Sequence, residues 1–245
     1  MISKNQITFI TSLKQKKYRM QHRRFVAEGK KTILEMLNSR FKLEQLYTTT
    51  LDFEVPDVLT TQITTMELQK ISYLKSPNEA LAVFEIPPGK PVDYTRLIIA
   101  LDDVRDPGNL GTIIRLCDWF GVRDLICSSE TVDCYNPKVV QASMGSMTRV
   151  NITYMDLEKL LASRRSLTKF GAYMDGENVY DLSLPESGIL VLGNEANGIS
   201  KPIGSQITQK IAIPRFGSLR ETESLNVANA AAIFLSEFRR RSIGR

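Results

Sequence analysis

Short apolar runs separated by polar segments with helical spacing dominate the chain from residue 96 onward. Six of these runs are predicted strands, and they lie within residues 96–104, 122–129, 148–155, 169–175, 188–195 and 210–214. Helices are expected at residues 111–120, 136–146 and 156–163, with a last helix at 225–240. Near-continuous apolar strands are typical of a parallel sheet covered on both faces, so this half is predicted to be an α/β domain.

The first 88 residues have a different pattern of shorter, alternating elements. Strands are expected at 25–27, 43–50 and 79–86, and helices at 29–38 and 64–72. The proline-rich stretch EIPPGKPVDYT, residues 85–95, is typical of a stiff linker. The predicted organisation is therefore a small α/β domain at 1–88, a linker at 89–95 and a second domain at 96–245.

Composition excludes several classes of protein. The longest apolar runs span about five to six residues, far short of the roughly 20 that cross a bilayer. The segment MISKNQITFITSLKQKKYRM has no uninterrupted apolar core, so a secretory signal is not expected. Three cysteines without a C-x-x-C pair indicate reduced thiols and a cytoplasmic protein. The single histidine, His22, argues against a histidine metal site and a Ser-His-Asp triad.

Charge is distributed unevenly along the chain. Residues 1–42 carry eleven Lys and Arg against two acids, which gives +9, whereas the net charge of the whole chain is +5. This asymmetry favours a polyanionic partner, with a solvated basic helix and a membrane surface as alternatives, although the apolar face needed for membrane insertion is missing. We expect RNA contacts from six of these cations: Lys14, Lys16, Lys17, Arg19, Arg23 and Arg24.

Three segments that follow predicted strands carry unusual chemistry. The first, DPGNLGTIIRLCDWFG at residues 106–121, is expected to place Asn109 in a loop and Arg115 in the helix behind it. The second, VLGNEANGIS at 191–200, holds Glu195 between two glycines, and the third places Ser224 and Asn226 at a helix start. Each alone is explained by a turn, a solvated acid or an N-cap. Together they are expected to meet at one edge of the sheet, where such folds bind ligands.

These segments resemble the motifs of the SpoU-type (TrmH-like) RNA ribose 2′-O-methyltransferases of the SPOUT superfamily. The first motif matches DDVRDPGNLGTIIRLCDWFG with its Asn109 and Arg115, and the second, G-x-E-x-x-G, matches Gly193, Glu195 and Gly198. The third motif is an Ile-Pro strand end followed by S-L-N-V, and it matches Ile213, Pro214, Ser224, Leu225, Asn226 and Val227. FVAEGKKTILEML is similar to the start of the small substrate-binding domain that precedes the catalytic domain in many members.

The resemblance implies a fold, a cofactor and a reaction. The fold would be a small N-terminal α/β RNA-binding domain and a parallel-sheet α/β catalytic domain with a C-terminal trefoil knot. S-adenosylmethionine would donate a methyl group to a ribose 2′-hydroxyl of tRNA or rRNA, in a homodimer with no metal and no membrane partner. The catalytic residues would be Arg115, Asn109, Glu195, Ser224 and Asn226. The cofactor would contact Leu192, Gly193, Ile213, Pro214 and Leu225.

Several alternatives stay open. An RNA-binding or ribosome-assembly protein that keeps the fold without catalysis would carry a similar pattern. Arg115 is either the proton acceptor, an electrostatic clamp on phosphate and alkoxide, or a structural partner of Asp102, Asp103 or Asp106. Loop 218–223, with Arg220 and Glu221, is longer than the loop common in relatives. The last helix has an apolar face that fits either a dimer contact or burial within one chain, at Val227, Ala231, Phe234, Leu235 and Phe238.

Overall fold

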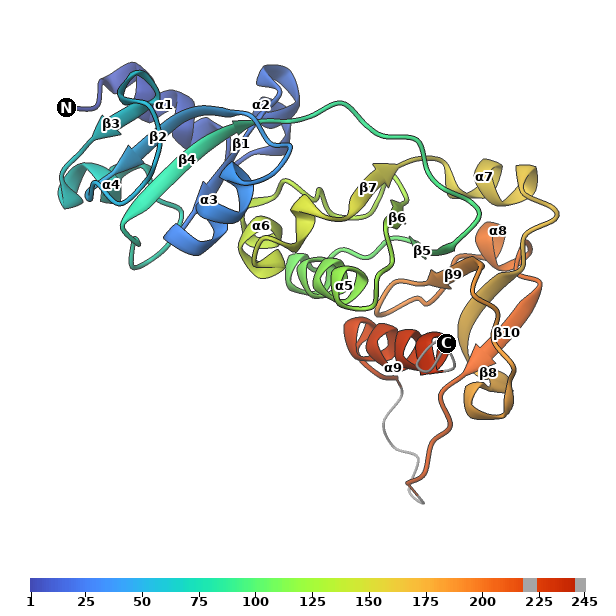
Figure 1. Ribbon diagram of the computed structural model, residues 1–245. Helices are drawn as coiled ribbons and strands as arrows, with labels where there is room; N and C mark the ends of the chain where they lie inside the picture. The colour runs from blue at the N-terminus through green and yellow to red at the C-terminus, as the bar shows by residue number, and fades with distance from the viewer. Residues whose placement is uncertain (218–223, 241–245) are drawn as a thin grey trace. The chain divides into compact units, whose positions relative to one another are not determined.

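The computed structural model describes residues 1–217 and 224–240, which form two compact units with one sheet each (Figure 1). The first unit comprises residues 1–88 together with 133–148. The second comprises 89–132 and the described residues from 149 onward. The predicted long loop 218–223, with Arg220 and Glu221, lies outside the described residues. The trefoil knot stays a prediction.

The first unit is built on a four-stranded mixed sheet in the order β1-β4-β2-β3. Its strands are β1 (Arg24–Glu28), β2 (Leu43–Thr48), β3 (Thr60–Gln62) and β4 (Ala80–Glu85). The central strand β4 is antiparallel to β1 and β2, and its first five residues are buried. The strands predicted at β1, β2 and β4 are confirmed. β3 was missed because its sequence, TTQ, is too short and too polar to give a period of two.

The helices of the first unit pack around this sheet. They are α1 (Lys4–Ser12), α2 (Lys16–His22), α3 (Lys30–Leu37), α4 (Thr65–Ile71) and α6 (Pro137–Ser143), with 3₁₀ turns η1 (Asp57–Leu59) and η2 (Ser146–Thr148). The predicted α3 and α4 are confirmed, whereas α1 and α2 were not predicted. α1 begins with a capping box in which Ser3 and Gln6 each accept a hydrogen bond from the other's backbone N–H. Ile10 and Leu13 then enter the core.

Arg19 lies in the interior of the first unit and does not reach solvent. Its side chain is 2% exposed and pairs with the carboxylate of Asp133 at 2.5 Å, while its Nη1 donates to the carbonyls of Leu13 and Lys14. The prediction that Arg19 contacts RNA phosphate is therefore wrong. A buried charge requires a partner, and Asp133 provides it. The bonds from the guanidinium to the two carbonyls close the turn between α1 and α2.

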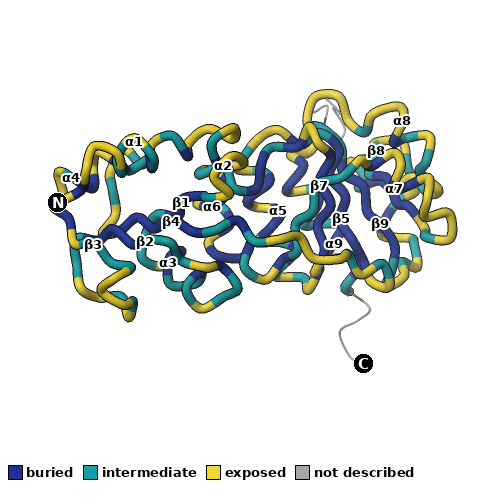
Figure 2. Tube along the Cα trace, turned by 90° about the horizontal axis from the view of Figure 1, so that it is seen from above, coloured by how far each residue is buried: buried dark blue, intermediate teal, exposed yellow. Residues whose placement is uncertain are grey.

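The second unit is built on a six-stranded sheet in the order β10-β8-β9-β5-β6-β7, in which every neighbouring pair is parallel. The strands are β5 (Leu97–Leu101), β6 (Asp124–Cys127), β7 (Asn151–Tyr154), β8 (Lys169–Asn178), β9 (Gly188–Leu192) and β10 (Gln209–Ala212). All six predicted strands are confirmed. β5, β6 and β9 are buried along their whole length, as Figure 2 shows for β5 and β9 in dark blue. This explains their continuous apolar sequences.

The helices of the second unit cover this sheet. They are α5 (Pro107–Trp119), α7 (Leu157–Ser163), α8 (Lys201–Gly204) and α9 (Val227–Arg240), with the 3₁₀ turn η3 (Val179–Asp181). The short α8 was not predicted, because a single helical turn of four residues is too short to show a helical period of apolar positions. Among the described residues, no helix combines the length and hydropathy that crossing a membrane requires.

The apolar face of α9 is covered by its own chain. α9 packs against α5, and the ring of Phe238 meets that of Phe170 edge-on at 5.2 Å between centroids. Arg239 Nε donates to the carbonyl of Phe120 at 2.9 Å, just beyond the end of α5. All five predicted face residues, Val227, Ala231, Phe234, Leu235 and Phe238, are buried. Of the two interpretations of this face, burial within one chain is the one observed.

Candidate active site

The start of α5 fixes the first candidate residue. Asp106 is the N-cap, and its carboxylate accepts a 2.8 Å hydrogen bond from the backbone N–H of Asn109. Pro107 occupies the first helical position, where its missing N–H costs nothing. Asn109 therefore lies in the first turn of α5, so the expectation of a loop position was wrong. The helix begins four residues before the predicted start, since D-P-G-N is a capping sequence and not a glycine loop.

Asn109 joins all three sequence motifs. Its side-chain Nδ2 donates to Glu195 Oε1 at 2.8 Å, and its Oδ1 accepts from Asn226 Nδ2 at 2.9 Å. Asn226 stands immediately before α9, and its own Oδ1 accepts from the backbone N–H groups of Ala228 and Asn229. The predicted meeting of Asn109, Glu195 and Asn226 at one edge of the sheet is thus observed, as a continuous hydrogen-bonded chain. We call Glu195, Asn109 and Asn226 the amide chain.

The segment after β9 is a tight turn that requires glycine. A Cβ on Gly193 would lie 2.2 Å from the carbonyl carbon of Gly198, so any side chain there would collide with backbone. Gly198 has φ of +67°, in the left-handed region. Asn194 closes the turn by exchanging backbone hydrogen bonds with Gly198 at 3.0 and 2.9 Å. The two glycines therefore bring Glu195 to the end of the sheet.

Two residues that sequence reasoning did not assign to the site anchor this turn. Asp102, 7% exposed at the end of β5, accepts a 2.7 Å hydrogen bond from the backbone N–H of Ser200. Asn194 Nδ2 donates to the carbonyl of Asp103 at 2.7 Å, and Asp103 itself has φ of +60°. Non-glycine residues with a positive φ are often found at active sites and ligand-binding sites, where the surrounding structure holds them in place. The sequence offered one indication of the role of Asp102, which is an acidic residue directly after a fully apolar strand.

Arg115 is exposed on α5 and forms no hydrogen bond or ion pair within the described part of the chain. The three aspartates considered as structural partners are engaged elsewhere. Asp102 binds Ser200, Asp103 pairs with Arg105 at 2.7 Å, and Asp106 caps α5. A purely structural role for Arg115 in an ion pair is thus not what the structure shows. The guanidinium is also not oriented by Asn109 or Glu195, whose side chains bond each other.

The five predicted cofactor contacts follow the carboxyl ends of strands or precede a helix. Leu192 is buried at the end of β9 and Gly193 follows it, while Ile213 and Pro214 are half-buried just after β10. Leu225 is 50% exposed before α9. Partly uncovered apolar side chains at strand ends and a turn with no room for a Cβ are features that fit a flat, partly apolar ligand such as adenosine. Ser224, two residues before Asn226, is exposed and open to a second substrate.

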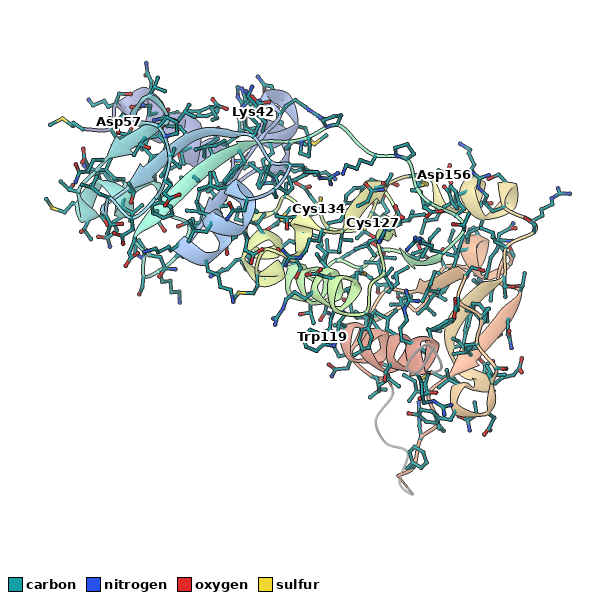
Figure 3. The ribbon with its side chains drawn as sticks, in the orientation of Figure 1. Lys42, Asp57, Trp119, Cys127, Cys134 and Asp156 are labelled. Carbon is teal, nitrogen blue, oxygen red and sulfur yellow. The ribbon has the colours of Figure 1, made fainter. Side chains whose placement is uncertain are left out.

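Thiol chemistry is not available beside the site at neutral pH. Cys117 on α5, Cys127 at the end of β6 and Cys134 are all buried, and Figure 3 labels the last two. Burial raises the pKa of Cys127 to about 12 and raises that of Cys117 further still. The groups that could act on a substrate are therefore the exposed Arg115, Ser224 and the amide chain.

Comparison with known proteins agrees with this geometry. Residues 96–236 match the SpoU rRNA Methylase family, and residues 4–82 match the MRM3-like substrate binding domain. The chain is 27% identical over 232 residues to the 23S rRNA (guanosine(2553)-2'-O)-methyltransferase RlmP of Bacillus subtilis, covering 91% of this chain and 92% of that protein.

Solved structures extend the likeness to the whole chain. A putative RNA methyltransferase of the TrmH family from Porphyromonas gingivalis superposes with a TM-score of 0.91 at 39% identity, covering 98% of this chain and 99% of that one. An AdoMet-bound rRNA methyltransferase from Sinorhizobium meliloti superposes with a TM-score of 0.87 at 27% identity, covering 100% and 98%. The chain belongs to the SpoU rRNA methylase family, with an N-terminal substrate-binding domain before its six-stranded catalytic domain.

Proposed function

We propose that the protein transfers a methyl group from S-adenosylmethionine to a ribose 2′-hydroxyl of ribosomal RNA. The observation that carries this proposal is the amide chain, which assembles three segments of the sequence at the start of α5, the helix that also carries the exposed Arg115. The full-length relative in Bacillus subtilis acts on 23S rRNA, and the Sinorhizobium meliloti relative binds the cofactor. We further propose that the protein acts in the cytoplasm.

The cofactor, when bound, supplies a sulfonium methyl group. The turn formed by Gly193 and Gly198, with Leu192 before it, would hold one side of the cofactor. Ile213, Pro214 and Leu225 would cover its adenine and exclude water. A dry site favours the reaction because a cation and a developing alkoxide become two neutral products.

Arg115 provides the charge for the RNA side of the reaction. A free guanidinium can bind the phosphate next to the target ribose through two parallel hydrogen bonds and stabilise the developing alkoxide. We assign it as an electrostatic clamp, since a guanidinium does not give up its proton at physiological pH, and the proton of the 2′-hydroxyl passes to the neighbouring phosphate or to water as the methyl group is transferred. Asn109 and Glu195 position the start of α5 and the turn after β9, and Ser224 and Asn226 orient the ribose from the start of α9.

The alternative is an RNA-binding protein of the same fold without catalysis. It would bind rRNA but would not need the Gly193 turn to accept a cofactor. Calorimetric titration with S-adenosylmethionine separates the two: the enzyme binds it at a single site per chain, and the inactive protein releases no heat. The reaction itself is tested by mapping 2′-O-methyl groups in total RNA from cells with and without the gene. Loss of one or more rRNA methyl groups is expected, and unchanged rRNA and tRNA maps would contradict the proposal.

We also propose that two copies associate. Because the apolar face of α9 is buried, the contact must use other residues. Trp119 is 84% exposed. It lies at the end of α5 (Figure 3), one helical turn beyond Arg115. A dimer contact through Trp119 would border the active site. Trp119→Lys should convert the dimer to a monomer in sedimentation velocity, and a sedimentation coefficient equal to that of the wild type would contradict this contact.

A further inference from the structure

The first 27 residues contain seven Lys and Arg and no acid. The structure divides these cations into two groups. Arg19 is buried, and Arg24 is half-buried in ion pairs with Glu44 and Glu85. The other five are exposed, and four of them lie on or beside the turn and helix α2: Lys14, Lys16, Lys17 and Arg23. The uncompensated charge is therefore concentrated on the α1–α2 hairpin.

Three aromatic rings lie on the same hairpin. Phe9 of α1 meets His22 edge-on, with ring centroids 5.2 Å apart and an interplanar angle of 80°. Tyr18 and His22, one turn apart on α2, are nearly parallel at 16°, with centroids 6.4 Å apart. His22 is exposed, and Phe9 and Tyr18 are half-buried. We call Phe9, Tyr18 and His22 the α1–α2 ring cluster.

The cations and the rings are held in one arrangement. Lys17 Nζ lies 5.8 Å from the centre of the Tyr18 ring. Arg19 Nη1 donates to the carbonyls of Leu13 and Lys14 at 2.9 and 2.8 Å, which fixes the turn that carries Lys14 and Lys16. The hydroxyl of Tyr73 donates to the carbonyl of Ile10, which ties α1 to the core. The surface is therefore preorganised, so less ordering entropy is lost when a ligand binds.

We propose that the α1–α2 ring cluster stacks an unpaired base of the RNA substrate while Lys14, Lys16 and Lys17 bind the flanking phosphates. Rings interleaved with cations are the combination that recognises single-stranded nucleic acid, because every base offers a π-face and every linkage a charge. Bases in an A-form duplex are already stacked and cannot reach the rings. A membrane contact would need an exposed apolar face, and Met20 is the large apolar side chain exposed on α2. This inference rests on the proposed function only in taking RNA as the substrate.

The test compares two fluorescently labelled oligomers of equal length and charge, an oligoadenylate and an abasic ribose-phosphate chain. The wild-type protein should bind the oligoadenylate more tightly. The double variant Tyr18→Leu with His22→Leu should lose affinity for the oligoadenylate by roughly 5- to 100-fold, the range expected for one stacked base, and bind the abasic chain as before. Its salt dependence should not change, because no cation is removed. Tyr18→Phe keeps the ring and should retain binding, and Met20→Ala is the matched exposed control on the same helix.

Several outcomes would overturn the inference. If the wild-type protein binds the two oligomers with equal affinity, the inference is overturned, and this result does not depend on whether any variant folds. An unchanged oligoadenylate affinity in the folded double variant, or an equal loss for Met20→Ala, also overturns it. If the double variant loses binding to phosphatidylserine vesicles and keeps the oligoadenylate, the cluster is a membrane contact. Methyl transfer to rRNA is measured separately: transfer without any base preference rejects only the stacking, and base preference without transfer rejects only the proposed enzyme.

Discussion

The side chain of Asn226 donates a 2.9 Å hydrogen bond to the side chain of Asn109, 117 residues earlier in the chain. The bond joins the residue that precedes α9 to the first turn of α5. Because Asn226 also accepts from two backbone N–H groups of α9, it fixes the start of that helix relative to α5. The orientation of both helices at the candidate site thus depends on one pair of amides.

This pair should behave as a unit in a double-mutant cycle. Asn109→Ala and Asn226→Ala should each slow methyl transfer, and the double variant should lose less than the sum of the two effects in free energy. Asn109→Ala should cost more than Asn226→Ala, because it also removes the bond to Glu195. Single-turnover rates with saturating rRNA and cofactor provide the measurement. Strictly additive losses would show that the two amides act independently.

Arg115 should be sensitive to the shape of its charged group. Arg115→Ala should lower the single-turnover rate by roughly two to four orders of magnitude, as expected for the loss of a charge-stabilising group. Arg115→Lys should be almost as slow, since an ammonium cannot form two parallel hydrogen bonds. Cofactor affinity should survive both changes, and Arg105→Lys, at an exposed arginine paired with Asp103, is the matched control. If Arg115→Lys transfers methyl groups at nearly the wild-type rate, the residue acts only through its charge and not through two parallel hydrogen bonds.

The Gly193 turn should be required for the cofactor. Gly193→Ala places a methyl group within 2.2 Å of backbone, so the turn must move. The affinity for S-adenosylmethionine should fall by roughly 5- to 100-fold, the range for a forced shift of a packed segment, while rRNA affinity is retained. Gly89→Ala, where a Cβ meets nothing within 4 Å, is the control. If calorimetry finds equal cofactor affinity in Gly193→Ala and Gly89→Ala, this turn does not contribute to the cofactor site.

The buried ion pair of Arg19 and Asp133 should support stability instead of RNA binding. Arg19→Met leaves a buried carboxylate without its partner and should cost about 3–5 kcal/mol of unfolding free energy. The double variant Arg19→Met with Asp133→Leu should recover much of this loss. Lys17→Met, which removes an exposed cation of the same helix, should leave stability nearly unchanged. Urea unfolding followed by circular dichroism measures all three, and an Arg19→Met protein as stable as the wild type would contradict the assignment.

Alkaline pH should destabilise the fold through its buried thiols. Burial raises the pKa of Cys127 from an ordinary value of 9.0 to about 12, so the folded state favours the protonated form. The stability from this difference is fully present below pH 9 and is lost as the pH rises toward 12. Cys127→Ala should show a smaller alkaline loss of unfolding free energy than the wild type. An equal loss in both would mean that Cys127 does not contribute.

The sequence predicted the catalytic fold well because its strands are buried on both faces and their apolar runs are unambiguous. It also predicted that the three motifs meet, since parallel strands bring their carboxyl ends to one edge. It did not show where Asn109 lies, because D-P-G-N was interpreted as a glycine loop when Asp106 and Pro107 are helix-start residues. The missed α1 had an available signal in the Ser3–Gln6 capping box.

Tertiary contacts explain what local pattern could not provide. In sequence, Arg19 cannot be distinguished from the exposed cations of the same basic segment. Its partner Asp133 comes from residues 133–148, which pack into the first unit. The apolar face of α9 would have the same sequence pattern in a dimer, and it is the packing against α5 and Phe170 that shows its burial within the chain. The anchoring of Ser200 by Asp102 joins residues 98 positions apart, which no periodicity reports.

The chemical position of the transferred methyl group distinguishes ribose 2′-O-methylation from any other methyl transfer to RNA. The purified protein is incubated with methyl-labelled S-adenosylmethionine and rRNA from cells that lack the gene, and the RNA is hydrolysed with alkali. A 2′-O-methyl group blocks alkaline cleavage of the linkage on its 3′ side, so we expect label in alkali-resistant dinucleotides for the wild type and almost none for Arg115→Ala. Label in alkali-released mononucleotides, or equal labelling by Arg115→Ala, would contradict ribose 2′-O-methylation at this site.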